Sequence, residues 1–203
     1  INAKFTRYSP VGLRIENRVN ILGSDLFKNG LVEIQDEGSQ LVSLLVDPQP
    51  NMLVIDLCAG GGGKTLAMAP IMKNTGKIFA CDVNDKRLSR LLPRLKRAHV
   101  TNANKVLLTG LEDSFYSDFD SSADRVVVDV PCSGSGVWRR NPDEKWKLNS
   151  EQLSNYVKEQ SKLLQTGAKL VSPSGRLIYI TCSILPIENE DQINTFLSKN
   201  KNF

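Results

Sequence analysis

The stretch that decides the fold is "MLVIDLCAGGGGKT", residues 52–65. An apolar run of strand length, residues 52–57, leads directly into a loop with four consecutive glycines, and a helix-like segment follows Lys64. Glycines at such a turn let backbone N–H groups approach a ligand closely, and the N-terminus of the next helix favours negative charge. The sequence therefore predicts a strand, a ligand-binding glycine loop and a helix in this order.

Four more apolar runs have the length and the β-branched content of buried strands. They are "KIFACD" (77–82), "NKVLL" (104–108), "RVVVDV" (125–130) and "RLIYIT" (176–181). Segments of helical period separate these runs. Strands that alternate with helices predict an α/β fold with a mostly parallel, doubly wound sheet and helices on both faces. Ligands of such sheets bind beyond the carboxyl ends of the strands.

Two segments show the periodicity of amphipathic helices. One has its apolar face at Leu88, Leu91, Leu92, Leu95 and Ala98, with a kink expected at Pro93. The other begins at Ser150, a plausible cap, and has its apolar face at Leu153, Tyr156, Val157, Leu163, Leu164, Leu170 and Val171.

The N-terminal part of the chain differs from the rest. Residues 1–40 contain short runs such as "GLRIE" and "LVEIQ", which Gly and Asn interrupt. We expect a small β-rich segment over residues 1–40, packed on a main domain of residues 41–203.

The composition is that of an ordinary globular protein. The chain has 203 residues, 40% of them hydrophobic and 24% charged, and no apolar run approaches the roughly 20 residues of a membrane helix. We find no secretory leader, although the chain begins with Ile1 rather than Met. We expect a soluble, cytoplasmic monomer with no membrane partner.

Four cysteines are spread singly, with no C-x-x-C pair, and His99 is the single histidine. This pattern fits a reducing cytoplasm, argues against Ser-His-Asp and Cys-His catalysis, and predicts no metal site. Each cysteine lies at or next to the carboxyl end of a predicted strand: Cys58, Cys81, Cys132 and Cys182. A net charge of +4 weakly favours a polyanionic partner.

The glycine loop matches neither common nucleotide motif. A phosphate loop ending at Gly63-Lys64-Thr65 would need Gly where Cys58 stands, and no register yields G-x-G-x-x-G. Asp82, at the end of the next strand, is placed to accept hydrogen bonds from ribose hydroxyls. A glycine loop with a strand-end carboxylate predicts a cofactor of adenosine type, whereas Asp82 alone would more often be a helix cap.

"DLCAGGGGKT", "DVPCSGSGVWRRNPDEKW" and "YITCSILPIENED", in this order and strand context, resemble the Sun-type (Fmu-like) RNA cytosine-5 methyltransferases. "VEIQDEGSQLVSLLV" (32–46) is similar to the segment before the cofactor strand, so the resemblance covers roughly residues 10–198. It implies a Rossmann-like methyltransferase fold, S-adenosylmethionine as cofactor and an RNA substrate. The cofactor-binding residues it implies are Cys58, Ala59, Gly60, Gly61, Gly62, Gly63, Lys64, Asp82, Arg87 and Asp129.

This chain departs from the family pattern at three places. Gly60 and Gly61 replace the usual Ala-Pro, which makes the loop more flexible. Thr109 or Gly110 stands where the family commonly has an Asp beside the adenine. We also expect a truncated C-terminus, because the family's closing strands are missing after Phe203.

Two cysteines are candidates for the nucleophile. Carbon 5 of cytosine becomes reactive when a thiolate adds to carbon 6, and either Cys132 or Cys182 has suitable chemistry. DNA cytosine-5 methyltransferases use the cysteine of a Pro-Cys motif, which would favour Cys132. The resemblance to the RNA family implies instead that Cys182 attacks and that Cys132 assists proton removal and product release. Asp129 would stabilise the charge on the base.

Further candidates concern RNA contacts. Trp138, Arg139, Arg140 and Lys145 combine aromatic and basic groups, whereas Trp146 either stacks on a base or anchors the loop. The basic run from Lys86 to Arg97 is a solvated helix face or a phosphate track. Glu188 and Glu190 favour a helix start more than a catalytic role.

The leading hypothesis is methylation of single-stranded or locally opened RNA, ribosomal RNA as in the bacterial members of the family. The alternatives are an amino-group methyltransferase and a non-catalytic RNA-binding module.

Overall fold

The computed structural model describes residues 2–111 and 113–203, which form two compact units, Ile1–Gly110 and Leu111–Phe203. In the first unit, β1 (Ala3–Phe5) and β2 (Leu13–Ile15) form an antiparallel pair. A 3-10 turn η1 (Ile21–Gly23) and two helices, α1 (Asp25–Lys28) and α2 (Glu37–Leu45), follow. The segment "LVEIQ" lies in the region expected to be β-rich, but it forms no strand. Its residues are an irregular segment that leads into α2.

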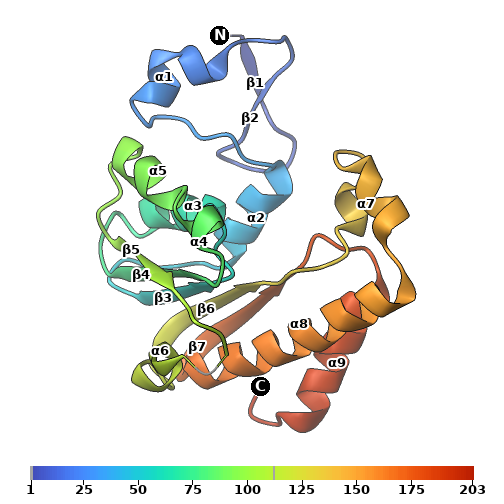
Figure 1. Cartoon of the computed structure of the whole chain (residues 1–203). Coiled ribbons are helices and arrows are strands. Elements are labelled where there is room, and N and C mark those ends of the chain that lie inside the picture. Colours follow the sequence, from blue (N-terminus) through green and yellow to red (C-terminus); the bar gives the residue numbers. More distant parts are fainter. Residues whose placement is uncertain (1, 112) are drawn as a thin grey trace. The chain divides into compact units, whose positions relative to one another are not determined.

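Three parallel strands make up the sheet of this unit (Figure 1). β3 (Leu53–Leu57) pairs with β4 (Lys77–Asp82), which pairs in turn with β5 (Ala103–Leu107). α3 (Gly63–Ile71), α4 (Asp85–Leu88) and α5 (Leu91–Arg97) connect these strands. The core beneath the helices consists of Leu66, Ala80, Leu88, Leu91 and Leu95.

The helix predicted around Pro93 is divided into α4 and α5. Proline lacks an N–H, and its ring collides with the carbonyl four residues earlier, which here belongs to Ser89. The interruption between Leu88 and Leu91 lies at that residue. Leu92 was expected on the buried face but is 52% exposed, since it points away from the core that Leu91 and Leu95 enter.

The second unit contains the remaining parallel strands. β6 (Ala123–Asp129) pairs with β7 (Val171–Ile180), and Asp129 lies opposite Ile180 at their carboxyl ends. The helices are α6 (Ser114–Asp118), α7 (Pro142–Lys147), α8 (Ser150–Leu170) and α9 (Glu190–Lys199), with 3-10 turns η2 (Ser135–Val137) and η3 (Pro186–Glu188). The two units have the strand-helix-strand organisation of the predicted Rossmann-like α/β fold.

Helix α8 packs closely on β6 and β7 because Gly167 lies at the contact (Figure 1). A Cβ atom at this position would lie 2.8 Å from both Leu177 Cδ1 and Val128 Cγ2. Asn149, not Ser150, caps the helix, and its side chain accepts a hydrogen bond from Gln152 N. Val171, predicted as the last residue of the helical face, is the first residue of β7 instead.

The predicted domains, residues 1–40 and 41–203, are not the same as these two compact units. The division into these domains stays a prediction. No helix in the described part of the chain is both long and apolar enough to cross a bilayer.

A buried hydrogen bond joins β3 to the helix after the glycine loop. Thr65 Oγ1 donates to Asp56 Oδ2 over 2.6 Å, and both residues are almost fully buried. Removing the donor of a buried carboxylate destabilises the fold more than removing an exposed hydrogen bond does, because water cannot replace the lost donor.

Thr65→Val should therefore lower the free energy of unfolding by about 1–3 kcal/mol in urea denaturation. Thr65→Ser keeps the hydroxyl and should lose less. A greater loss for serine than for valine would assign the effect to the lost methyl group and contradict this role of the hydrogen bond.

Candidate active site

The glycine loop, residues 58–64, turns sharply between β3 and α3. Gly60 has φ of 56° and Gly62 has φ of 78°, a backbone region that side chains rarely occupy. Gly62 N donates to Ala59 O over 2.9 Å and closes the turn. A Cβ atom at Gly62 would lie 2.1 Å from Leu91 Cδ1, whereas one at Gly60 would meet no atom within 4 Å. The loop is therefore packed on one side and open to a ligand beside Gly60.

Asp82 lies against this loop, as the sequence predicted. Asp82 is 6% exposed. Its Oδ2 accepts a hydrogen bond from Gly60 N over 2.8 Å, and its Oδ1 accepts one from Asn84 N over 2.7 Å. The carboxylate and the open side of the glycine loop thus adjoin at the carboxyl ends of β3 and β4. An acceptor-only group beside open backbone is the chemistry that a ribose with two hydroxyl donors requires, so these residues fit an adenosine-type cofactor.

The other predicted cofactor residues of this unit differ in exposure. Lys64 is half-buried in the first turn of α3, and Cys58 and Ala59 are half-buried before it. Arg87 is exposed on α4, where its backbone N donates to the capping side chain of Asn84. Asp82 is not the helix cap that a lone carboxylate at this position would suggest, because Asn84 caps α4.

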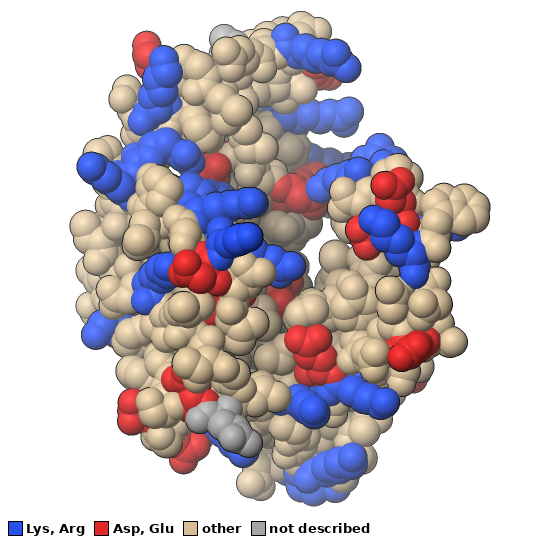
Figure 2. Space-filling model, viewed as in Figure 1, with Lys and Arg blue, Asp and Glu red and all other residues tan. Residues whose placement is uncertain are grey.

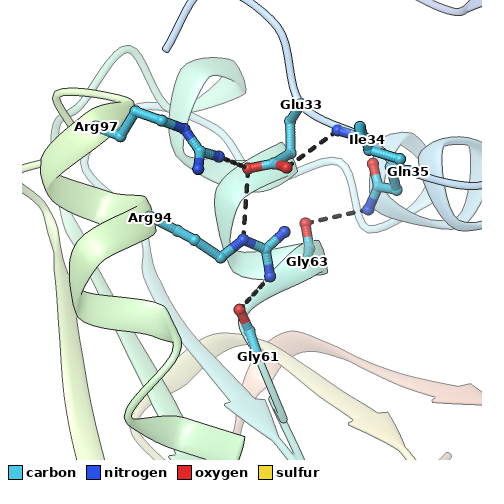
Figure 3. Close-up of polar contacts among 7 residues, drawn as sticks. All are labelled: Glu33, Ile34, Gln35, Gly61, Gly63, Arg94 and Arg97. Carbon is cyan, nitrogen blue, oxygen red and sulfur yellow. Dashed lines mark hydrogen bonds and ion pairs between the residues drawn. The ribbon is translucent and has the colours of Figure 1, made fainter. Parts of the chain in front are cut away.

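Two side chains of the basic run, which the sequence left open between a solvated helix face and a phosphate track, have structural partners. Figure 3 shows Arg94 reaching both Glu33 and the carbonyl oxygen of Gly61, and Arg97 pairing with the same Glu33 carboxylate. Figure 2 shows Lys and Arg side chains gathered over α4 and α5, so other members of the run remain at the surface.

In the second unit, two loops bring a pair of cysteines together. Cys132 follows β6 and Cys182 follows β7, and their sulfur atoms are 3.3 Å apart. Gly136 N donates to Cys182 O over 3.0 Å, which fixes the second loop to the first. Cys182 is exposed, Cys132 is half-buried, and all four cysteines are free thiols. The two candidate nucleophiles are therefore in direct contact.

The contact changes the acidity of both thiols in opposite directions. The hydrogen bond with Cys182 lowers the pKa of Cys132 to about 7, although burial opposes the shift. The same hydrogen bond raises the pKa of Cys182, and desolvation, the charge of Cys132 and the charge of Asp129 add to the effect. Either sulfur can be the donor. The pair thus holds one proton and one thiolate near neutral pH, whereas an ordinary cysteine is mostly protonated there.

A buried carboxylate supports the loop of Cys132. Glu188 is fully buried, and its Oε1 accepts from Ser133 N and from Gln160 Nε2, each over 2.9 Å. Its Oε2 accepts from Ser133 Oγ. Burial alone would raise the pKa of Glu188, but hydrogen bonds from Ser133, Ser183 and Gln160 outweigh it and hold this pKa below the usual range.

Serine hydroxyls extend this network to the loop of Cys182. Ser183 Oγ lies 3.2 Å from Ser133 Oγ and 2.9 Å from Ser135 Oγ. Ser135 Oγ also accepts from Ile184 N over 2.8 Å. Gln160 on α8 donates to Pro131 O over 2.9 Å, next to the first cysteine. The residues flanking both cysteines are therefore fixed by one continuous set of hydrogen bonds.

Sequence reasoning gave Glu188 a minor role and did not consider Gln160. The sequence of α8 does contain a signal for this buried contact, because Gln160 is a polar residue that interrupts the predicted apolar face. In the structure Gln160 is fully buried. A polar residue on a buried helix face needs a partner, and here the partner is Glu188.

The predicted RNA-contacting residues separate into two groups. Arg139, Arg140 and Lys145 are exposed. Trp138 is half-buried, and its indole Nε1 donates to Ser133 O over 3.2 Å, so it anchors the loop. Trp146 was open to either role, and the structure leaves it 81% exposed on α7 beside the ammonium of Lys145.

Among the described residues, no cluster of three or more His, Cys, Asp or Glu side chains has an arrangement that could bind a metal ion. The glycine loop with its strand-end carboxylate, on parallel strands with helical connections, defines a Rossmann-like α/β domain of the methyltransferase class.

The model of the family described as 16S rRNA methyltransferase RsmB/F matches residues 43–203, and the chain belongs to this family. Over 193 residues it is 36% identical to ribosomal RNA small subunit methyltransferase B of Salmonella arizonae. The aligned region covers 94% of this chain and 44% of that protein. The chain spans less than half the length of the curated relatives it matches first.

Two solved structures are similar to nearly the whole chain. The structure titled PH0851 has a TM-score of 0.92 and 35% identity, covering 98% of this chain and 45% of that one. A methyltransferase homolog protein from Pyrococcus horikoshii has a TM-score of 0.82 and 29% identity, covering 98% of this chain and 62% of that one. Both confirm the predicted fold.

The thiol pair should show its shared proton in alkylation kinetics. In the wild type, the rate of iodoacetamide modification at Cys132 should rise with a midpoint near pH 7. Cys182→Ala removes the hydrogen bond that lowers this pKa, so the midpoint for Cys132 should rise toward the ordinary value of about 8.5 or above. Mass spectrometry at each pH identifies the modified residue. Cys81→Ala serves as the control and should keep the midpoint near 7, whereas an unchanged midpoint for Cys132 in Cys182→Ala would contradict the coupling.

Glu188→Gln should lower the free energy of unfolding at pH 7 by about 1–3 kcal/mol, because charge-assisted hydrogen bonds are replaced by neutral ones. A carboxyl with a lowered pKa in the folded protein contributes stability above the pKa of the unfolded chain and loses it in acid. The difference between wild type and variant in urea denaturation should therefore be largest above about pH 5 and shrink below about pH 4. A difference independent of pH would exclude the ionised carboxylate as its source.

Proposed function

We propose that this protein transfers a methyl group from S-adenosylmethionine to carbon 5 of a cytosine in RNA, and that the RNA is ribosomal. The observation that supports this best is the contact between Cys132 and Cys182, 3.3 Å apart at the ends of two parallel strands. The RsmB/F family match and the methyltransferases among the relatives support the reaction class and the substrate.

The glycine loop and Asp82 would bind the cofactor, which supplies the methyl group when bound. Asp82 would accept the ribose hydroxyls, and the open backbone beside Gly60 would receive the rest of the molecule. Cys58, Ala59, Gly61, Gly62, Gly63 and Lys64 belong to the same turn, and we assign Arg87 and Asp129 to the cofactor as well.

We assign the attack on carbon 6 to Cys182. Its exposure makes its sulfur the accessible one of the pair, and a base that reaches this loop meets Cys182 before the half-buried Cys132. Because their hydrogen bond lowers the pKa of Cys132 and raises that of Cys182, Cys132 would act as the base that takes the proton of Cys182 while Cys182 attacks. Asp129, at the end of β6, would stabilise charge at N3 of the base.

Cys132 would then release the proton it took from Cys182 to solvent and, as a thiolate again, accept the proton from carbon 5. The electrons of that C–H bond restore the ring double bond and expel the Cys182 thiolate, and the product leaves. The lowered pKa of Cys132 suits a group that must accept a proton near neutral pH. Exposed Arg139, Arg140 and Lys145 would hold RNA phosphates near this loop, with Trp138 fixing the loop that bears the two arginines.

We place the reaction in the cytoplasm, because four free cysteines with two in direct contact require a reducing environment. A monomer stays our expectation.

The roles of the two cysteines can be separated by trapping the covalent intermediate. With RNA and S-adenosylmethionine, Cys132→Ala should accumulate a protein-RNA adduct that resists denaturation, because the bond to Cys182 no longer breaks. Cys182→Ala should form no adduct, and Cys81→Ala should behave as the wild type. Electrophoresis under denaturing conditions with labelled RNA measures all three.

The reverse pattern would make Cys132 the nucleophile. RNA binding without adduct or methylation in any variant would favour a non-catalytic RNA-binding module.

A further inference from the structure

The glycine loop accepts hydrogen bonds from two side chains that lie outside the loop. Arg94 on α5 donates through Nη1 to the carbonyl oxygen of Gly61, and Gln35 donates through Nε2 to Gly63 O over 3.1 Å (Figure 3). Both donors therefore bind carbonyl oxygens of the loop. A Cβ atom at Gly61 would lie only 3.3 Å from Arg94 Nη1, which shows how closely the guanidinium approaches the backbone.

Glu33 orients Arg94 for this contact. Glu33 Oε2 accepts from Arg94 Nε over 3.4 Å and also pairs with Arg97 Nη2, while its Oε1 accepts from Ile34 N over 3.0 Å. Arg97 in turn lies 3.9 Å from the centroid of the Phe27 ring. One carboxylate from the N-terminal segment thus pairs with two guanidinium groups of α5.

These charges are partly shielded from solvent. The exposed fractions of the side chains are 24% for Arg94, 27% for Glu33 and 20% for Arg97. An exposed ion pair contributes little because water and salt screen it, whereas a pair with this degree of burial interacts more strongly. Without Glu33, the two guanidinium groups would repel each other, and Arg94 would lose the partner that fixes its planar fork.

The loop itself has little to hold its shape. Four consecutive glycines lose more conformational entropy on ordering than other residues do, by roughly 0.5–1 kcal/mol each relative to alanine. A ligand that has to order such a loop binds more weakly, since part of the binding free energy is spent on the ordering. External hydrogen bonds to Gly61 and Gly63 restrict the loop before the ligand arrives.

From these contacts we propose that Glu33 and Arg94 are positioning residues for S-adenosylmethionine. They hold the glycine loop in its binding conformation, so that the N-terminal segment contributes to cofactor affinity without touching the cofactor. This inference rests on the proposed function, because it takes the glycine loop as the site for that cofactor.

Calorimetric titration of the purified chain with S-adenosylmethionine tests the proposal. Glu33→Gln removes the charge that orients Arg94 and should weaken binding about five- to twentyfold, a loss in the range of one ordered ion pair and its preorganisation. Arg94→Lys keeps the positive charge but cannot contact Glu33 and Gly61 through a rigid fork, so it should weaken binding to a similar degree.

Glu16→Gln is the matched control. It makes the same chemical change in the same N-terminal segment and removes the ion pair of Glu16 with Lys4, whose atoms are 3.0 Å apart and whose side chains are 57% and 67% exposed. Its affinity for S-adenosylmethionine should equal that of the wild type.

Hydrogen-deuterium exchange of the free protein provides a readout that does not depend on the cofactor. Backbone amides of residues 58–64 should exchange faster in Glu33→Gln and Arg94→Lys than in the wild type, while those of β4 should not change. If the wild type failed to bind S-adenosylmethionine, the proposed function would be wrong. If the wild type bound it and both variants bound it equally well, or if Glu16→Gln lost as much affinity, the positioning role would be overturned.

Discussion

The buried carboxylate of Glu188 is the constraint on which the cysteine arrangement depends. An ionised carboxylate without solvent is costly unless donors surround it, and here the donors are neutral: a backbone amide, a hydroxyl and a side-chain amide. Each of these groups belongs to a segment that must be placed accurately. Satisfying the charge therefore fixes the loop after β6 and helix α8 at the same time.

This arrangement affects the cysteine pair in two opposing ways. Fixed loops hold two sulfurs 3.3 Å apart, a separation at which one proton serves both. The negative charge of Glu188 also disfavours a thiolate at Cys132, so the low pKa of that thiol depends on the hydrogen bond rather than on the surroundings. A thiol whose acidity depends on one partner changes character when that partner becomes bonded to substrate.

Most of the fold could be predicted because its strands are short, buried and apolar. The run at residues 77–82 coincides with β4, and the other four runs overlap observed strands. The errors lie where local and tertiary preferences compete. Leu92 has the spacing of a core residue, but Pro93 divides the helix, and α5 turns Leu92 toward solvent.

The candidate site was only partly predictable, since a motif identifies residues but not the contacts behind them. The glycines, Asp82 and the two cysteines stand in recognisable patterns at strand ends. Glu188, Gln160 and Glu33 do not, because the contacts that tie them to the site join residues between 28 and 64 positions apart along the chain: Gln160 with Glu188, Glu188 with Ser133, and Glu33 with Arg97. Such contacts arise from the folded backbone, and no local spacing encodes them.

The hydrogen bond from Arg94 to Gly61 has a consequence for the salt response of the glycine loop. A proline in the loop would restrict it covalently and equally under all conditions, because the ring limits the unfolded chain too. Arg94 restricts the loop through a side chain that an ion pair orients, and salt screens such a close, partly buried pair only in part. Rising ionic strength should therefore loosen this glycine turn to a limited degree, whereas a turn restricted by proline would not respond.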